Sequence, residues 1–222
     1  MLQWYRADIA KYLTDADALK ALDAFNLIPS ELSNPNKRFV LKNLNERMRL
    51  RSFEDALLWL NTSNMALAVY NVDAPVRPLL AAKKRSLFKL FYCDVGLLTS
   101  QYGEGVTTEL LTKSGSTDTN FGAVYENAVA QELVTSGFTP YYYNSKKLDE
   151  VDFVVETRRG TVLPIEVKSG KTYKRHHALH NILAIPEFHL TQGIVLSESN
   201  VEPEGTVLNL PIYMAGLLDP EA

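Results

Sequence analysis

Two carboxylates and a lysine in the second half of the chain have the residue types and spacing of a reactive site. Asp152 lies in "EVDFVVE" (150–156), and Glu166 and Lys168 lie in "TVLPIEVK" (161–168). Carboxylate oxygens are hard ligands that suit Mg²⁺ or Mn²⁺. Such an ion can polarise a phosphoryl oxygen and lower the pKa of a bound water. A lysine beside it can orient that water and offset negative charge on the attacked phosphate.

A β-hairpin would bring these residues together. Both segments have strand character, and "TRRG" between them predicts a turn. If residue 156 pairs with residue 162, Asp152 lies across from Glu166 at about 5 Å. Two carboxylates so close repel each other unless a positive charge lies between them, and either Lys168 or a divalent cation could supply it. The alternative interpretation is a salt-bridged edge strand, because a Glu-x-Lys triplet is common by chance.

A helix predicted over residues 120–137, "NFGAVYENAVAQELVTSG", offers a further acid. Asn120 can cap its start and Gly137 can end it. Glu126 on this helix could complete a second metal position. The following elements are a short strand at "PYYYN", the hairpin, a helix at "KRHHALHNILA" and a strand over 188–197. Helix, strand, hairpin, helix and strand predict a mixed sheet with helices on its faces.

"SGKT" at residues 169–172 looks like the end of a phosphate-binding loop, but its spacing excludes that interpretation. Such a loop needs a glycine five positions before its Gly-Lys pair, and Ile165 stands there instead. No Gly-x-x-x-x-Gly-Lys-Ser/Thr string occurs in the sequence. We therefore expect no nucleotide-binding residues and no ATP site in this chain.

The strings "FGAVYENAVAQEL", "EVDFVVE" and "LPIEVKSG" resemble the PD-(D/E)xK nuclease superfamily. More closely, nearly the whole chain is similar to the domain of unknown function found C-terminal to the ATPase module of a prokaryotic AAA-type ATPase family. "YRADIAKYL", "NKRFVLKNLNERMRLRSFEDALLWL" and "KKRSLFKLFYCDVGLL" carry this resemblance in the front half. The resemblance implies that Asp152 and Glu166 bind a metal ion, that Lys168 is the catalytic lysine and that Glu126 is the helix acid. It also implies an ATPase module as partner, which this chain lacks.

The front part predicts helices at "WYRADIAKYL" and "ADALKALDAFNLI", the second stopped by Pro29, and another after Ser52 as cap. Strands at 65–73 and 86–94 follow. Helices followed by a hairpin are the order of a winged helix. "KRFVLKNLNERMRLR" (37–51) and "KKR" (83–85) are basic clusters that could hold phosphates. The alternative interpretation of these basic clusters is a helix face that is exposed to solvent and binds no phosphate.

Several further side chains could contact DNA. Phosphate contacts are expected from Arg47, Arg49 and Arg51 in the first basic cluster and from Lys171, Lys174 and Arg175 after the "IEVK" strand. Tyr141, Tyr142 and Tyr143 could stack on bases, although core packing is the favoured interpretation. His176 and His180 have zinc-ligand spacing, but no cysteine lies near them in the sequence. A basic, partly exposed helix is therefore favoured over a zinc site.

The composition fits a folded protein of a reducing compartment. The chain has 222 residues, 46% of them hydrophobic, a single cysteine and a net charge of −3, with a slightly basic front half and an acidic back half. No apolar stretch approaches the length of a membrane span, so we expect a cytoplasmic protein. We predict a winged-helix-like part over 1–119 and a restriction-endonuclease-like α/β domain over 120–222. The expected function is Mg²⁺- or Mn²⁺-dependent hydrolysis of DNA, and the alternative is a regulatory module that binds DNA or a protein without cutting.

Overall fold

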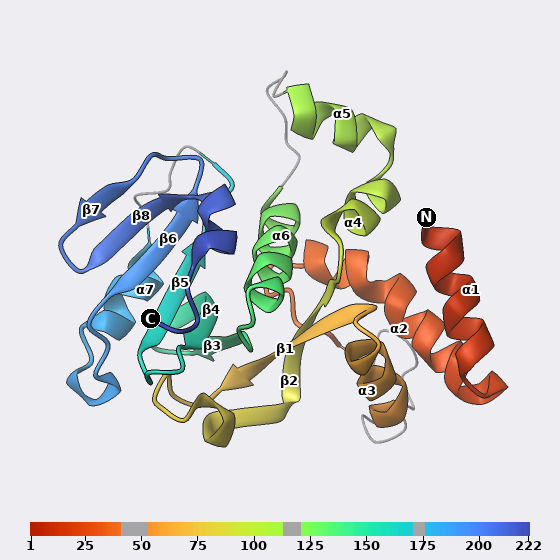
Figure 1. Ribbon diagram of the computed structural model, residues 1–222, viewed down its shortest axis with the longest axis horizontal. Coiled ribbons are helices and arrows are strands. Elements are labelled where there is room, and N and C mark those ends of the chain that lie inside the picture. Colours follow the sequence, from red (N-terminus) through yellow and green to blue (C-terminus); the bar gives the residue numbers. More distant parts are fainter. Residues whose placement is uncertain (41–52, 113–120, 171–175) are drawn as a thin grey trace. The chain divides into compact units, whose positions relative to one another are not determined.

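The computed structural model describes residues 1–40, 53–112, 121–170 and 176–222, which form two compact units (Figure 1). The first unit is built from residues 1–68 and 86–119, and the second from residues 69–85 and 120–222. No pattern in the sequence predicted that residues 69–85 pack with the second unit. Both units are mixtures of helices and strands, so the expected α/β class is confirmed at this level.

The helices of the first unit agree in part with the sequence. The three expected ones within the described residues are α1 (Leu2–Tyr12), α2 (Asp15–Ser33) and α3 (Glu54–Thr62). Phe53 occupies the N-cap position of α3, and Ser52 lies outside the described residues. The sequence did not predict α4 (Val95–Tyr102) and α5 (Glu104–Thr112), because Gly, Ser and Thr dominate that stretch.

The sequence predicted that Pro29 ends α2. This prediction is wrong, because the helix continues through Pro29 to Ser33. A proline has no backbone N–H, so the carbonyl four residues earlier, that of Phe25, loses its normal helical partner. The hydroxyl of Tyr92 donates a hydrogen bond of 2.7 Å to that carbonyl. The helix is therefore repaired by a side chain from a distant part of the sequence.

The strands among the described residues form one eight-stranded mixed sheet. Its order is β2-β1-β3-β4-β5-β6-β8-β7. The strands are β1 (Ala66–Val72), β2 (Lys83–Tyr92), β3 (Tyr141–Ser145), β4 (Asp149–Glu156), β5 (Val162–Val167), β6 (Gly193–Ser197), β7 (Glu202–Glu204) and β8 (Val207–Pro211). β1 pairs with β3 in parallel, so β1 and β2 extend this sheet and are not the separate hairpin of a winged helix. β7 and β8 were not predicted.

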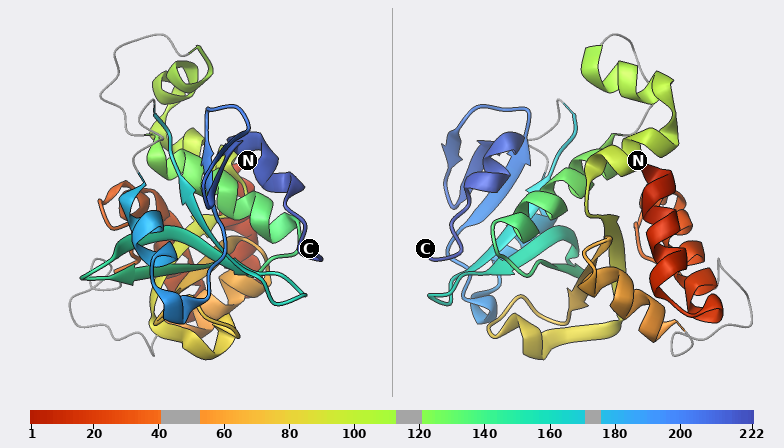
Figure 2. Two further views of the ribbon diagram at one scale, coloured as in Figure 1. Left: turned by 90° about the vertical axis from the view of Figure 1, so that its left-hand side faces the viewer. Right: turned by 45° about the vertical axis from the view of Figure 1, so that its right-hand side comes forward.

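Helices cover both faces of the central strands. α6 (Gly122–Thr135) packs on β5 from one side, and α7 (His177–Leu183) packs on β4 and β5 from the other (Figure 2). The expected C-terminal signal of α6 is present, since Gly137 has a φ of 94° and Phe138 N–H bonds to the Leu133 carbonyl. Asn120, the expected cap, lies outside the described residues, and Phe121 takes the N-cap position.

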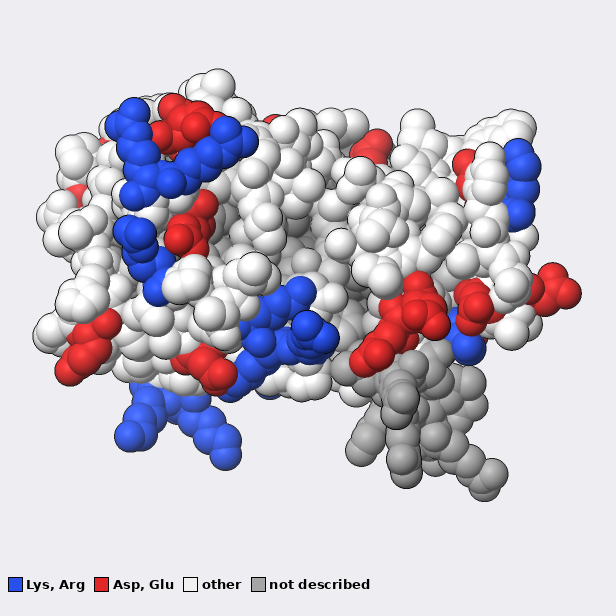
Figure 3. Space-filling view, turned by 60° about the horizontal axis from the view of Figure 1, so that its bottom comes forward, with Lys and Arg blue, Asp and Glu red and all other residues white. Residues whose placement is uncertain are grey.

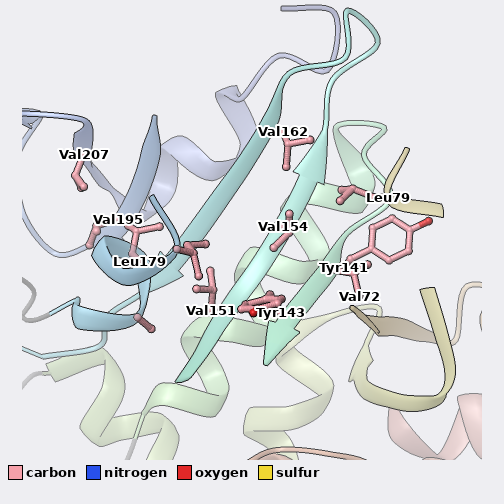
Figure 4. Close-up of a cluster of buried hydrophobic side chains, with 12 residues drawn as sticks. Val72, Leu79, Tyr141, Tyr143, Val151, Val154, Val162, Leu179, Val195 and Val207 are labelled. Atoms are coloured by element: carbon pink, nitrogen blue, oxygen red, sulfur yellow. The ribbon is translucent and has the colours of Figure 1, made fainter. Parts of the chain in front are cut away.

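A hydrophobic cluster lies between α7 and the sheet (Figure 4). It joins the side chains of α7 to those of β3, β4, β6 and β8. Its buried members are Val72, Leu79, Tyr141, Tyr143, Val151, Val154, Val162, Ala178, Leu179, Ile182, Val195 and Val207. Tyr141, Tyr142 and Tyr143 are all buried, so the favoured core interpretation of these tyrosines is confirmed. Three short 3₁₀ helices, η3 (Leu79–Ala82), η4 (Pro186–Phe188) and η5 (Ile212–Leu217), complete the described elements.

Candidate functional site

The hairpin that carries the candidate site has the register on which the expected proximity of Asp152 and Glu166 was conditional. Glu156 pairs with Val162, and the antiparallel ladder between β4 and β5 continues as far as Phe153 and Ile165. Asp152 and Glu166 are the next residues in this register. The assumed pairing of residues 156 and 162 is therefore confirmed.

β4 and β5 separate at the two acids. The N–H of Val167 donates to Oδ2 of Asp152 at 2.8 Å instead of continuing the ladder. The N–H of Lys168 donates to the carbonyl of Leu196 at 2.9 Å, which joins β5 to β6. The carboxylate of Asp152 thus takes the place of a backbone partner where the strands part, and it is held close to the end of β5.

A second irregularity affects Asp152. On β3, Tyr141 pairs with Val154 and Tyr143 pairs with Val151, so the register shifts between them. Two residues of β4, Asp152 and Phe153, therefore face the single residue Tyr142. Such a β-bulge bends a strand and changes the direction of a side chain. Residues along a regular strand alternate between its two faces, but Val151 and Val154, three positions apart, belong to the same cluster.

The lysine and one acid form a close ion pair. Lys168 Nζ lies 2.6 Å from Glu166 Oε1. Burial by itself lowers the pKa of Lys168, but the charges of Glu166, Asp152 and Glu126 together with the hydrogen bond to Glu166 outweigh it, so the pKa is raised above its ordinary value. Lys168 therefore stays protonated at neutral pH.

The structure places Lys168 against Glu166, and it places the carboxylate of Asp152 against the backbone of Val167 at the end of β5. Exposed fractions are 9% for Asp152, 6% for Glu166 and 2% for Glu126, so each acid is largely withdrawn from water. All three act on the charge of Lys168. Buried acids are stabilised by a nearby positive charge and by hydrogen bonds. The lysine is thus the electrostatic centre of the site.

Asp152 and Glu166 are carboxylates, the ligand type that divalent cations such as Mg²⁺ prefer. Within the described residues, no three His, Cys, Asp or Glu side chains converge closely enough to hold an ion by themselves. Mg²⁺ commonly binds through one or two carboxylates and keeps several waters. Asp152 and Glu166 are the two carboxylates at this end of the hairpin, and one oxygen of each already has a partner, Val167 N–H for Asp152 and Lys168 Nζ for Glu166.

One pair beside the site was missed by the sequence analysis. The hydroxyl of Tyr125 on α6 donates to Oε1 of Glu198, which follows β6. Burial and this carboxylate raise the pKa of Tyr125. The bond ties α6, next to Glu126, to the end of the strand that neighbours Lys168. The signal in the sequence was Glu198, an acid directly after a predicted strand. Its partner Tyr125 lies on a helix far away in the chain, so the pairing could not be predicted.

The expected DNA contacts cannot be compared with the structure. Arg47, Arg49, Arg51, Lys171, Lys174 and Arg175 all lie outside the described residues. His176 is buried, and its ring centroid lies 4.5 Å from that of His180. Among the described residues these two histidines belong to no group able to hold a metal.

The fold is mixed α/β, and a lysine is paired with a buried acid where two of its strands separate. Residues 121–213 match the model of a domain of unknown function, DUF4143, which is commonly found in proteins associated with AAA-type ATPases. Residues 1–108 match a second domain of unknown function, DUF8612. No curated protein and no solved structure matches the chain significantly. No helix among the described residues is long and apolar enough to cross a membrane.

Proposed function

We propose that the second unit is a metal-dependent nuclease-like domain that hydrolyses phosphodiester bonds in DNA. The observation that carries this proposal is the ion pair of Lys168 with the buried Glu166 beside the buried Asp152, at the point where β4 and β5 separate. Hard oxygen ligands beside a permanently charged lysine are suited to an anionic phosphate whose negative charge grows during attack.

The finer fold class, a restriction-endonuclease-like domain, is part of the same proposal. Its support is the order α6, β3, β4, β5, α7 and β6 within the second unit. β3, β4 and β5 run antiparallel, and β6 returns parallel to β5. A helix between two parallel strands is the normal way to connect them, and here that connection lies directly after the candidate lysine.

The side chains would have separate roles in this reaction. Asp152 and Glu166 would hold the divalent ion, which supplies a more acidic water and a polarised phosphoryl oxygen when bound. Lys168 would orient the attacking water and stabilise the developing charge on the phosphate. Glu126 would hold the ammonium of Lys168 in place from α6. The hydrogen bond from Val167 N–H would fix the carboxylate of Asp152.

An AAA-type ATPase is the proposed partner. Its support is the match of residues 121–213 to a domain common in ATPase-associated proteins, together with the absence of a phosphate-binding loop from this sequence. ATP hydrolysis would then take place on another module, and the second unit would act on or bind the DNA that this module moves.

A non-cleaving DNA- or protein-binding module is the second candidate. The observation that favours it is the ion pair between Lys168 and Glu166, together with the backbone bond to Asp152. These contacts can also be understood as neutralisation of buried acids within a sheet. In that case Lys168 stabilises the fold and takes no part in a reaction.

The substitution Lys168→Met separates the two candidates. For a nuclease, we expect Mn²⁺-dependent cleavage of plasmid DNA to fall by about 10²–10³, because the electrostatic stabilisation of the transition state is lost. DNA affinity should change little. The exposed Lys146 of the same unit provides the matched control, since Lys146→Met removes the same charge without touching the site.

Mn²⁺ binding gives an independent readout of the acids. Calorimetry should show weak binding to the wild type and to Lys168→Met, and a clear loss in Glu166→Ala. Identical titrations for wild type and Glu166→Ala would remove the metal site from consideration. A wild-type protein that binds Mn²⁺ but never cuts DNA would favour the binding module.

A further inference from the structure

The start of β2 carries three consecutive basic residues, Lys83, Lys84 and Arg85, within the second unit. β2 is an outer strand of the sheet. Figure 3 brings the lower part of Figure 1 forward and shows Lys and Arg side chains gathered in groups on that face. Because strand residues alternate in direction, Lys83 and Arg85 point to one side of β2 and Lys84 to the other.

The two sides differ in their partners. Lys84 forms an ion pair with Asp73. Lys83 instead lies over an aromatic ring, with Nζ 3.5 Å from the centroid of Tyr70. Within the described part of the chain, neither Lys83 nor Arg85 is paired with a carboxylate. Among these residues, the side that carries Lys83 and Arg85 therefore has two positive charges and no compensating acid.

The two cations on this side of β2 repel each other. Burial, and then the like charge of Arg85, lower the pKa of Lys83. The ring of Tyr70 stabilises the ammonium through a cation–π contact and holds it in one place. Tyr70 itself packs against the hydrophobic cluster under α7. Its ring is therefore held in position beneath the ammonium of Lys83. An anion between the two cations would remove their repulsion.

We propose that Lys83 and Arg85 bind the phosphate backbone of DNA. Arg85 can donate two parallel hydrogen bonds to a phosphate, and Lys83 can act as a point charge beside it. The cation pair follows from the contacts alone, whereas the choice of DNA as its occupant rests on the proposed function. Charged edge strands also prevent sheets from associating edge to edge, and that role would need no anion.

Lys83→Gln, Arg85→Gln and Lys84→Gln test the site, because each removes one charge from the same strand. The probe is a fluorescently labelled DNA duplex in EDTA, with the dissociation constant measured by anisotropy over a range of salt concentrations. Affinity falls as the salt concentration rises, so the slope of log affinity against log salt is negative. We expect Lys83→Gln and Arg85→Gln each to make this slope shallower by about 0.9, the contribution of one phosphate contact. Lys84→Gln should leave it unchanged.

Three results would contradict the proposal. Equal changes of the salt slope in all three variants would mean that only the net charge of the protein matters. An unchanged slope in every variant would mean that these residues only prevent association at the sheet edge. Poly-glutamate that displaces the duplex at equal charge concentration would identify an acidic protein as the occupant. Cleavage in Mn²⁺ is measured separately on the same variants, so a failure of this site is distinguishable from a failure of the nuclease proposal.

Discussion

At the scale of the residue, Lys168 explains how three acids can be buried together. Glu166 contacts it directly, and Asp152 and Glu126 act on the same charge. Removing the lysine leaves the acids to repel each other in a poorly solvated place. An uncompensated buried charge is destabilising, so Lys168 contributes to the stability of the fold in both candidate functions, and only the loss of cleavage by folded Lys168→Met protein distinguishes them.

The pH dependence of stability should reveal this role. The folded-state pKa of Lys168 is raised above its ordinary value of 10.5. Its stabilisation is therefore complete below that value and is lost as the pH rises through the raised pKa. The difference in the free energy of unfolding between wild type and Lys168→Met should be constant from pH 8 to about pH 10 and shrink above it. Urea unfolding at several pH values measures it.

The exposed Lys146 again provides the control, since Lys146→Met should show no comparable difference at any of these pH values. A difference for Lys168→Met that does not vary with pH would mean that the aliphatic stem of the lysine, and not its charge, stabilises the fold.

At the scale of the element, α2 shows how a helix can continue through a proline. The hydroxyl of Tyr92 takes the place of the N–H that Pro29 lacks, and Tyr92 is fully buried. The backbone carbonyl of Pro29 in turn accepts a hydrogen bond of 2.8 Å from Ser33 Oγ, one turn further along the helix. The second half of α2 therefore depends on β2 for its stability.

Tyr92→Phe should lower the free energy of unfolding by about 1–3 kcal/mol, the cost of leaving a buried acceptor without its partner. Chemical denaturation of the full chain measures it. In a Pro29→Ala background the same substitution should cost less, because an alanine at this position would again provide an N–H for the carbonyl of Phe25. Equal costs in both backgrounds would mean that the hydroxyl does not compensate for the proline.

At the scale of the whole molecule, the second unit is discontinuous in sequence. Residues 69–85 supply the second part of β1, in which Tyr70, Asn71 and Val72 pair with the three tyrosines of β3. The same segment places Val72 and Leu79 in the cluster under α7. The match to residues 121–213 therefore does not include every residue that completes this unit.

A fragment of residues 120–222 should be far less stable than the second unit in the full chain. It would lose the parallel ladder on β3 and roughly 3–6 kcal/mol from Val72 and Leu79, at about 1.5–3 kcal/mol for each fully buried side chain. Thermal melts and size-exclusion chromatography measure the effect. The matched control is the same fragment with residues 69–85 joined through a Gly-Ser linker. A fragment that melts like this control would show that β1 is dispensable.

The sequence by itself determined the hairpin and its residues. The strand character of the segments on both sides of "TRRG" predicted the hairpin, and the assumed pairing of residues 156 and 162, which the structure has, puts Asp152 and Glu166 at its end. Glu126 was predicted from the pattern of one helix and from a family resemblance. Such signals are local, because register and helix faces depend on residues that are close in the chain.

Only the tertiary structure decided how the site is assembled. The bulge at Asp152 depends on the pairing of β4 with β3, and where β4 and β5 separate the carboxylate of Asp152 accepts the N–H of Val167 in place of a backbone partner. The passage of α2 through Pro29 depends on Tyr92, and the sheet is complete only with β1. Each of these features joins segments far apart in the chain, and tertiary contacts of this kind override the local preferences on which sequence patterns rest.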